Sequence, residues 1–397
     1  MKMNKSILAL ALALSAATIA KADVYMTGST AMRGVVYNAI VHPGTVFQSA
    51  PTFYGFGGAG SSDNYMAFSG TLVGGSGTTV LYCNWTGSED GIAHVAQNTT
   101  QTFIDSSLIT GTGSDPTNTT PTTTQTHTCD LAMGDNDQPF SRTTSPILNT
   151  KSEVGIITFE WVRNNGTWSG TGTNVTASQI RQALNGGAKL AVFTGNVGDT
   201  NSYVYVSGRD SGSGTRVNAF GTSGFGILTS PKQIELSSGV MQILTTSTNI
   251  HTGLVTTNYI GDYGFSSGGT LAKSLGASTT TATDYVHTNG TGFGVISYLG
   301  VSDANTAIGS PYNATALTFE GVPFTPANVI EGSYTYWGNE FIYENNAVAV
   351  NSDPDKIYNL LIPVSTGIPS FCDGVKAISL AAMHCTRNGP TTDPVHN

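Results

Sequence analysis

The chain has 397 residues, a formal net charge of −9 and a charged fraction of only 10%. This length allows two or more domains with real hydrophobic cores. With 16 Lys and Arg residues in total, the chain lacks the basic patches that neutralise nucleic-acid phosphates, which excludes nucleic acid as a partner. The seven histidines are scattered, so neither a metal site nor a cofactor is expected. Any bound anion has to be held by local dipoles and one or two cations.

Residues 1–22 have the pattern of a cleaved secretory signal. Two lysines form a positive start, and the apolar run that follows, residues 7–20, is shorter than the ~20 residues of a membrane-spanning helix. Small residues flank Lys21 at the expected cleavage site, so the mature chain should begin at Asp23. Cleavage removes three lysines and no acidic residue, which takes the formal charge from −9 to −12.

Four cysteines without a C-x-x-C pair are consistent with an oxidising compartment. Cys372 and Cys385 are close in sequence, and we expect them to form a disulfide. Cys83 and Cys129 each lie near the end of an expected strand and could pair if those strands are neighbours. Four cysteines allow three connectivities, and the sequence does not choose between them.

Apolar runs alternate with short helical patterns along the chain, which predicts an α/β fold. A strand at 23–26 leads through a Gly-Ser-Thr turn to a helix over 32–40, where apolar residues recur at helical spacing. A second strand, 79–83, leads to a helix that opens at Ser88 with two acidic residues in its first turn. A third strand, 129–133, ends in an acidic turn.

The second half of the chain repeats this alternation. Residues 155–162 predict a strand, and a capping box at 176–179 opens a helix. A strand at 203–206 leads into a Gly- and Ser-rich loop and a short helix, and another strand follows at 292–299. No fixed-period repeat is present, which argues against a propeller or a β-helix.

Residues 99–128 are rich in Thr and poor in apolar residues, so they predict a surface insertion. The high Thr, Gly and Ser content leaves one alternative class open. A structural or adhesive surface protein would have this composition, and it would carry no small-molecule ligand and no buried arginine.

Three loops share one design, in which a strand ends, small or hydroxyl residues follow, and a helix begins. These loops are residues 28–31, 87–90 and 212–216. Each exposes free backbone N–H groups at the positive end of a helix, and in an open α/β sheet such loops gather at the carboxyl edge. Arg209 lies four residues before Ser213, and a guanidinium can hold a tetrahedral oxyanion through two parallel hydrogen bonds. Together these features predict an anion site.

Residues 205–215, with Arg-x-x-x-Ser-Gly-Thr after a strand, resemble the phosphate loop of the periplasmic phosphate-binding proteins of ABC importers. Residues 26–31 resemble the N-terminal loop of that family, and residues 87–92 resemble its second loop. Residues 130–135 resemble the strand that delivers the family's acidic ligand. Weaker likenesses at 176–186 and 293–299 extend the resemblance to about residue 336.

The resemblance implies an α/β periplasmic binding protein of type 2, with two lobes, two interlobe crossovers and a ligand cleft between the lobes. The first lobe would comprise residues 23–154 and 332–397, and the second residues 155–331. The implied function is capture of inorganic phosphate, or a similar tetrahedral oxyanion, without catalysis. The implied setting is a monomer in the periplasm that delivers its ligand to a membrane ABC permease.

The resemblance also implies a set of eight phosphate ligands: Thr30, Ala31, Ser88, Asp135, Arg209, Ser213, Gly214 and Thr215. Ala31 stands where the family has a bulkier aromatic residue, and Asp210 follows Arg209 directly instead of two residues later. Asp137 is a rival of Asp135 for the acidic position. A carboxylate at an anion site favours a ligand that can donate a proton, so the site would prefer phosphate to sulfate.

A secreted serine hydrolase is a further alternative. The pattern G-x-S-x-G occurs around Ser266, after an apolar segment and before a helical pattern. Asp284 or Asp303 and His287 or His384 would complete the Ser–Asp–His order. The abundance of Gly and Ser in the chain makes a chance match the simpler explanation.

Overall fold

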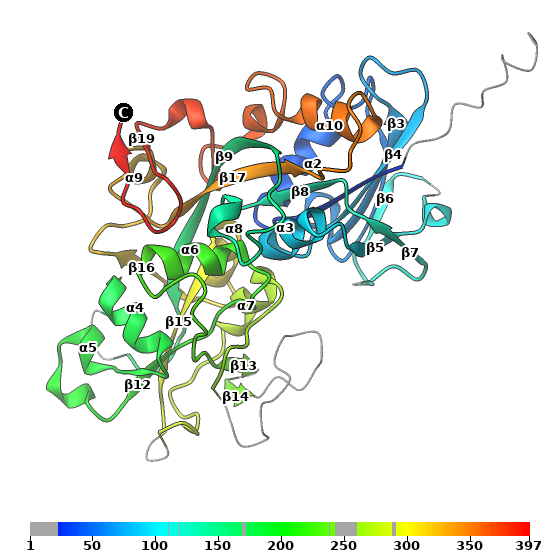
Figure 1. The fold of residues 1–397 in the computed structure, drawn as a ribbon. Coiled ribbons are helices and arrows are strands. Elements are labelled where there is room, and N and C mark those ends of the chain that lie inside the picture. Colours follow the sequence, from blue (N-terminus) through cyan, green and yellow to red (C-terminus); the bar gives the residue numbers. More distant parts are fainter. Residues whose placement is uncertain are drawn as a thin grey trace, which may run out of the picture.

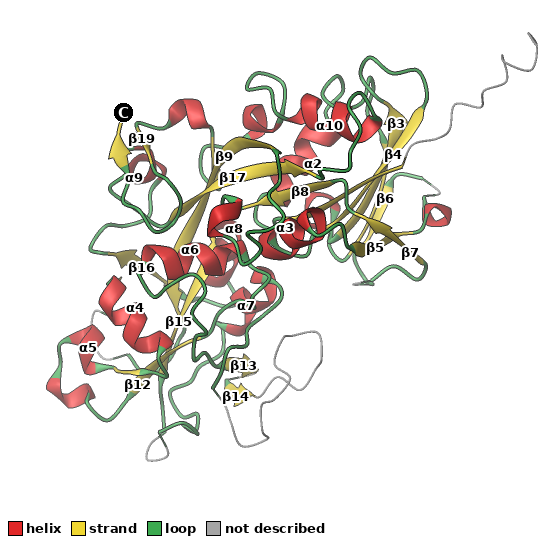
Figure 2. Ribbon diagram, in the orientation of Figure 1, coloured by secondary structure: helices red, strands yellow, loops and turns green. Residues whose placement is uncertain are grey.

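The computed structural model describes residues 23–109, 111–118, 120–168, 172–237, 239–242, 260–287 and 291–397. The expected signal at residues 1–22 lies outside these ranges. Within them, no helix is long and apolar enough to cross a membrane. Strands and helices alternate around one large sheet (Figures 1 and 2), so the predicted α/β architecture is confirmed.

The large sheet has 14 strands, eleven of which form its main path. Their order is β11 (Ala188–Lys189), β12 (Tyr203–Val206), β15 (Gly294–Gly300), β9 (Thr150–Arg163), β17 (Trp337–Glu344), β8 (Leu131–Gly134), β1 (Asp23–Gly28), β4 (Thr78–Asn84), β3 (Tyr65–Thr71), β2 (Thr52–Phe56) and β6 (Gly113–Asp115). Three short strands join beside this path: β10 (Asn174–Val175), β16 (Thr315–Phe319) and β18 (Ala377–Ile378). Three separate pairs are β5 (Thr100–Ile104) with β7 (Thr124–Thr128), β13 (Glu235–Ser237) with β14 (Val240–Gln242), and β19 (Cys385–Thr386) with β20 (Val395–His396).

Short helices connect and cover the strands. The α-helices are α2 (Arg33–Val41), α3 (Ser88–Ala96), α4 (Ala177–Leu184), α5 (Ala191–Thr194), α6 (Gly214–Thr222), α7 (Gly268–Ser274), α8 (Val301–Ile308), α9 (Pro326–Ile330) and α10 (Asp353–Leu361). The 3₁₀ turns are η2 (Gly60–Ser62), η3 (Ser106–Leu108), η4 (Gln138–Phe140), η5 (Val197–Asp199), η6 (Ile368–Phe371) and η7 (Leu380–Ala382).

The sheet passes through two lobes, which Figure 1 shows as separate masses. The first lobe is built around β1, β4 and β8, and the second around β12 and β15. The long strand β9 joins them, because its early residues pair with β17 and its late residues pair with β15 and β16. A cleft of about 710 Å³ lies between the lobes, since residues of both line it.

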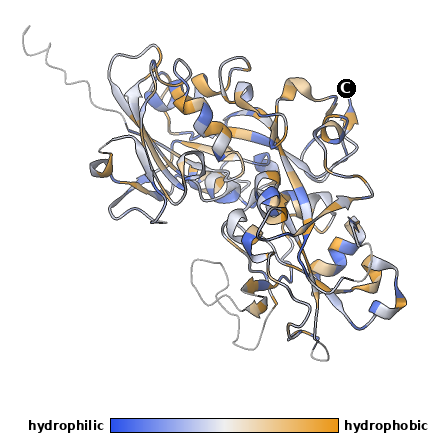
Figure 3. Cartoon of the chain, turned by 180° about the vertical axis from the view of Figure 1, so that it is seen from behind, coloured by the Kyte–Doolittle hydropathy of each residue, from blue (hydrophilic) through white to orange (hydrophobic). Residues whose placement is uncertain are grey.

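Helices cover both faces of the sheet in the first lobe. Side chains alternate across a strand, so each central strand contributes to the core on either face. On β1, Val24 and Met26 face the core that contains α2, whereas Tyr25 faces the core that contains α3. Hydrophilic residues interrupt several of the central strands (Figure 3). Two of them, Glu160 and Glu340, are buried carboxyl groups.

The Thr-rich segment is more ordered in its described residues than its composition suggests. β5 and β7 form an antiparallel pair, and β6 extends the edge of the large sheet next to β2. Phe103 and Ile104 of β5 are buried in the core beneath, and Leu108 and Ile109 pack against it, so a few apolar side chains anchor an otherwise polar insertion.

The predicted disulfides are wrong, because all four cysteines are free thiols. Cys83 lies in the core on the α2 face of the sheet and Cys129 in the core on the α3 face, so their side chains point to opposite sides. The predicted pair Cys372–Cys385 is also separated. Cys372 packs near Gly155 on β9, whereas Cys385 packs against Gly332 after α9.

Candidate functional site

Three loops of the first lobe meet at one edge of the sheet. Strands β1, β4 and β8 are parallel neighbours, so their carboxyl ends lie side by side. The Gly87 N–H donates to the Gly28 carbonyl at 2.9 Å, and the Ser29 N–H donates to the Met133 carbonyl at 2.9 Å. A Cβ atom on Gly28 would lie 2.1 Å from the Met133 oxygen, and its φ is +115°, so glycine is required there.

The loop before α6 in the second lobe closes onto this edge. The Glu89 N–H, in the first turn of α3, donates to the Gly212 carbonyl at 3.0 Å. A Cβ atom on Gly214 would lie 2.6 Å from Ser88 Oγ and 2.9 Å from Asp135 Cβ. The structure therefore brings together Ser88, Asp135 and Gly214, although more than a hundred residues separate the first from the last.

Asp135 is the acidic residue of this cluster. It is 2% exposed and accepts a hydrogen bond of 2.5 Å from Ser29 Oγ. Burial and the charge of Asp135 raise the pKa of the neighbouring Glu340 well above its usual range, so Glu340 keeps its proton. Asp137 points elsewhere, since its two oxygens bind Lys151 Nζ at 2.5 and 2.6 Å.

Two helix N-termini meet at the loop contact. Ser88 is the first residue of α3 and is 1% exposed, and its Oγ has no hydrogen-bond partner among the described residues. Ser213 caps α6 by accepting a hydrogen bond from the Arg216 N–H, and Thr215 lies in the first turn, 3% exposed. Free N–H groups at two helix starts favour negative charge.

Arg209 is a buried cation, 3% exposed, and not a surface arginine paired with Asp210. Its Nε donates to the Phe265 carbonyl at 3.0 Å and its Nη2 to the Ser266 carbonyl at 2.8 Å. A Cβ atom built on Gly268 would lie near both Asp303 Oδ2 and Arg209 Nη1, so these two groups are neighbours. The two carbonyls fix the guanidinium and leave about three of its five N–H donors for other partners.

Arg33 and Asp303 belong to the same charged group, and the sequence did not single them out as binding residues. Arg33 is the first residue of α2, and its Nη1 donates to Asn64 Oδ1. Burial lowers the pKa of Arg33, and the carboxylates of Asp303 and Asp63 oppose that shift. Two guanidinium groups, Arg33 and Arg209, therefore lie near Asp303. The available signal was the position of Arg33, two residues after the 28–31 loop.

Two carboxyl groups beside Arg209 have raised pKa values. Burial raises the pKa of Asp90 to about 7, with Asp210 and Glu89 adding to the shift and Arg209 and Arg142 opposing it. Burial also raises the pKa of Asp210, against the opposing charge of Arg209. Asp90 therefore changes charge near neutral pH, directly beside the loop contact.

The eight predicted ligand positions divide into two groups. Thr30 and Ala31 line the cleft between the lobes, together with Arg33, Asp90 and Asp303. The other positions do not line it: Ser88, Asp135, Arg209, Ser213, Gly214 and Thr215. All six are buried beside the cleft, where the loops of the two lobes touch.

The geometry does not support the hydrolase alternative. Ser266 is exposed, but each candidate histidine is engaged elsewhere. His287 Nδ1 lies 2.5 Å from the Tyr205 hydroxyl, which also donates to Asp284, and His384 binds Glu331 at 2.6 Å. Neither histidine is placed to take a proton from Ser266.

No family model and no curated protein matches the chain. Among solved structures, it is similar to a putative phosphate ABC transporter substrate-binding protein with bound phosphate from Clostridium perfringens, at 14% identity and a TM-score of 0.47, covering 90% of this chain and 99% of that one. An ABC-type phosphate transport receptor from Vibrio cholerae matches at 12% identity and a TM-score of 0.41, covering 85% and 93%. PstS from Borrelia burgdorferi matches at 11% identity and a TM-score of 0.40, covering 90% and 99%.

Proposed function

We propose that the chain is an exported binding protein that captures inorganic phosphate, or a similar tetrahedral oxyanion, for ABC-type uptake. One observation carries this proposal: a buried guanidinium, Arg209, is fixed by two backbone carbonyls beside the N-termini of α3 and α6. Burying a charge is unfavourable unless it is paired and hydrogen-bonded, and an anionic ligand would pair with this one. Convergent N–H groups and a guanidinium are the groups that hold phosphate oxygens.

Each lobe would supply a different part of the binding shell. Thr30, Ser88 and Asp135 come from the first lobe, and Arg209 with Ser213, Gly214 and Thr215 comes from the second. Hydroxyl and N–H groups would donate to the anion, while Asp135 would accept the proton that phosphate carries near neutral pH. A ligand that contacts both lobes stabilises their closed arrangement. Binding requires no covalent step, so the chain would act without catalysis.

Calorimetry on the mature chain, starting at Asp23, tests this function. Co-purifying anions are first removed by unfolding, dialysis and refolding, and phosphate is then titrated with sulfate as the comparison ligand. We expect saturable binding of one phosphate per chain and much weaker binding of sulfate. A refolded chain with native circular dichroism that binds neither anion would contradict the proposal.

Location and transport are part of the same proposal and need their own measurements. N-terminal sequencing of protein recovered from the periplasm should give Asp23 as the first residue. Size-exclusion chromatography with light scattering should give the mass of a monomer. Phosphate uptake by cells should depend on the chain together with a membrane ABC permease.

A further inference from the structure

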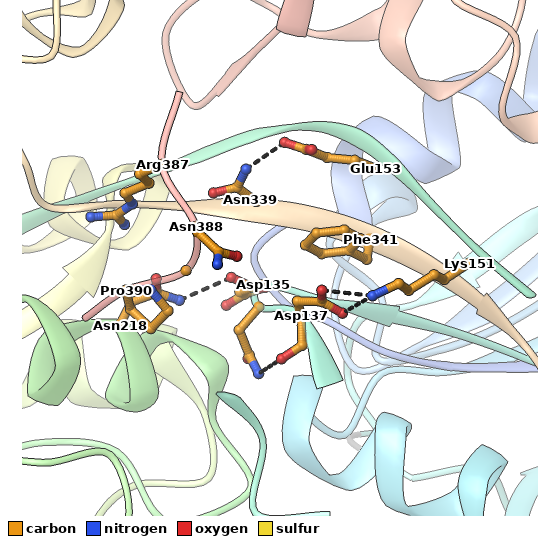
Figure 4. Close-up of a pocket in the computed structure, with 12 residues that line it drawn as sticks. Asp135, Asp137, Lys151, Glu153, Asn218, Asn339, Phe341, Arg387, Asn388 and Pro390 are labelled. Carbon is orange, nitrogen blue, oxygen red and sulfur yellow. Dashed lines mark hydrogen bonds and ion pairs between the residues drawn. The ribbon is translucent and has the colours of Figure 1, made fainter. Parts of the chain in front are cut away.

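A second cavity, of about 280 Å³, lies beside the loop that follows β8, residues 135–137, which we call the β8 loop (Figure 4). Its walls come from this loop, β9, β17, α6 and the C-terminal segment 387–390. The two cavities have no lining residue in common. The volume is several times the ~30 Å³ occupied by one water molecule and close to the lower end of small-molecule sites, about 300 Å³.

Asn218, on α6, presents an unused acceptor at the wall of this cavity. The side chain is 1% exposed, and its Nδ2 donates to the backbone oxygens of Asp135 and Gly214, both at 3.0 Å. Both partners are acceptors, so the amide nitrogen must face them and the orientation of the group is fixed. The remaining Oδ1 has no hydrogen-bond partner within the described ranges.

Asn339, on β17, repeats this arrangement at another wall. Its Nδ2 donates to Glu153 Oε1 at 2.5 Å, which again fixes the amide orientation, and its buried Oδ1 lacks a partner in the part of the chain that the structure describes. A buried acceptor without a donor is unfavourable and rare in native proteins. Asn136 Oδ1, at the same cavity, also lacks a partner among the described residues, and such acceptors together indicate a ligand that brings its own donors.

The charged residues around the cavity narrow the chemical class of the ligand. Three carboxylates line it and each has a partner: Asp135 accepts from Ser29, Asp137 is paired with Lys151, and Glu153 accepts from Asn339. Arg387 also lines the cavity; its Nη1 donates to the Thr335 carbonyl at 2.8 Å, and its Nε and Nη2 have no partner within the described ranges. A ligand therefore has to donate to the amide oxygens and accept from Arg387. Hydroxyl groups do both, so a neutral molecule with several hydroxyl groups fits.

Phe341 and Asn388 complete the surroundings. The Phe341 ring gives the cavity one apolar wall, on which the C–H face of a cyclic polyol can pack. Asn388 is exposed and carries both donor and acceptor groups. We propose that this cavity is a second binding site, for a neutral polyol of about the size of a monosaccharide, whose hydroxyls donate to Asn218 Oδ1 and Asn339 Oδ1.

Ligand-observed NMR and calorimetry test the site with a defined panel: glycerol, myo-inositol, D-glucose and D-galactose, with ethanolamine as the cationic comparison. We expect saturable binding of at least one polyol at millimolar concentrations and none of ethanolamine. Asn339→Leu keeps the approximate volume but removes the acceptor, and it should weaken polyol binding by about tenfold or more. Phe341→Ala should weaken it several-fold and serves as a second variant if Asn339→Leu unfolds.

Asn359→Leu, on α10 and outside the cavity, is the matched control and should bind the polyol as the unmodified chain does. A phosphate titration of Asn339→Leu tests whether this site is independent of the cleft. The phosphate affinity of this variant should equal that of the unmodified chain. Saturable binding of no polyol, binding unaffected by both cavity variants, or binding of ethanolamine in place of polyols would each overturn the proposal.

Discussion

The cleft and the second cavity have no lining residue in common, and the chemical groups around them differ. In and beside the cleft, the charged groups Arg33, Arg209 and Asp303 lie near one another; Arg209 is buried, whereas Arg33 and Asp303 line the cleft. Around the second cavity Asp137 and Lys151 are paired, and the unused atoms are amide oxygens and two nitrogens of Arg387. Two guanidinium groups with spare donors suit an anion, whereas spare acceptors beside spare donors suit hydroxyl groups, which donate and accept.

The first way to break this comparison is to remove the cation fixed beside the cleft. Arg209→Ala should reduce phosphate affinity by several kcal/mol, because a hydrogen bond to a charged group contributes about 1.5–3 kcal/mol. The phosphate affinity of Arg209→Lys should lie between those of Arg209→Ala and the unmodified chain, because lysine keeps the charge but lacks the planar guanidinium. Calorimetric titration of phosphate provides the measurement.

Arg181→Ala is the matched control, because Arg181 lies on α4 and binds the Ser223 carbonyl away from the cleft. It should leave phosphate affinity unchanged. Equal affinities for Arg209→Ala and the unmodified chain would show that the anion binds elsewhere.

The second prediction concerns the two aspartates of the β8 loop. Asp135→Asn should reduce the preference for phosphate over sulfate by about a hundredfold, because a site built to accept a proton rejects ligands that lack one. Asp137→Asn should leave the preference intact, since that side chain binds Lys151. Competition titrations of the two anions compare the variants directly. Equal selectivity in both variants would show that Asp135 does not contact the anion.

The third prediction concerns the contact between the lobes. Gly214→Ala would place a methyl group against Ser88 Oγ and Asp135 Cβ, so the loops could not approach as closely. We expect phosphate affinity to fall by about 2 kcal/mol, in the range of over-packing costs. Gly111→Ala, where an added Cβ meets nothing within 4 Å, is the control. Small-angle scattering would show whether the Gly214→Ala chain is more open, and unchanged affinity would mean that the contact does not support binding.

Much of the framework was predictable because its signals are local. The strands expected at 23–26, 79–83 and 203–206 match β1, β4 and β12 closely, and the capping box at 176–179 opens α4 as predicted. Turn glycines and caps act within a few residues, so a single sequence contains them. The predicted loops after β1, β4 and before α6 do meet at one edge.

Features that depend on which distant segments become neighbours were not predictable. The sequence could not show that Cys83 and Cys129 face opposite sides of the sheet, which prevents them from pairing. Arg33 and Asp303, from different lobes and 270 positions apart in the chain, lie close enough for the charge of Asp303 to affect the pKa of Arg33. The second cavity draws its amides from α6, β17 and the C-terminal segment, and no motif links those positions.

The last and smallest effect is a pH dependence that separates the cleft from the second cavity. The pKa of Asp90 is about 7 in the folded chain, raised first by burial and then by Asp210 and Glu89, with Arg209 and Arg142 opposing. Below pH 7 the carboxyl is mostly neutral, and above it the group becomes an anion beside the site. Phosphate affinity should therefore fall several-fold, by about 1 kcal/mol, as the pH rises from 6 to 8. Phosphate itself changes charge in this range, so the test is the difference between the unmodified chain and Asp90→Asn. The variant should bind more tightly at pH 8 and about equally at pH 6.

The free energy of unfolding should depend on pH in the same direction. The pKa of Asp90 is higher in the folded chain than its unfolded value near 4, so its ionisation does not destabilise the fold below pH 4 and destabilises it fully above pH 7. Asp90→Asn should thus gain free energy of unfolding relative to the unmodified chain as the pH rises, while polyol binding at the second cavity stays unchanged. A difference between the two chains that does not vary with pH would mean that Asp90 does not titrate beside the anion.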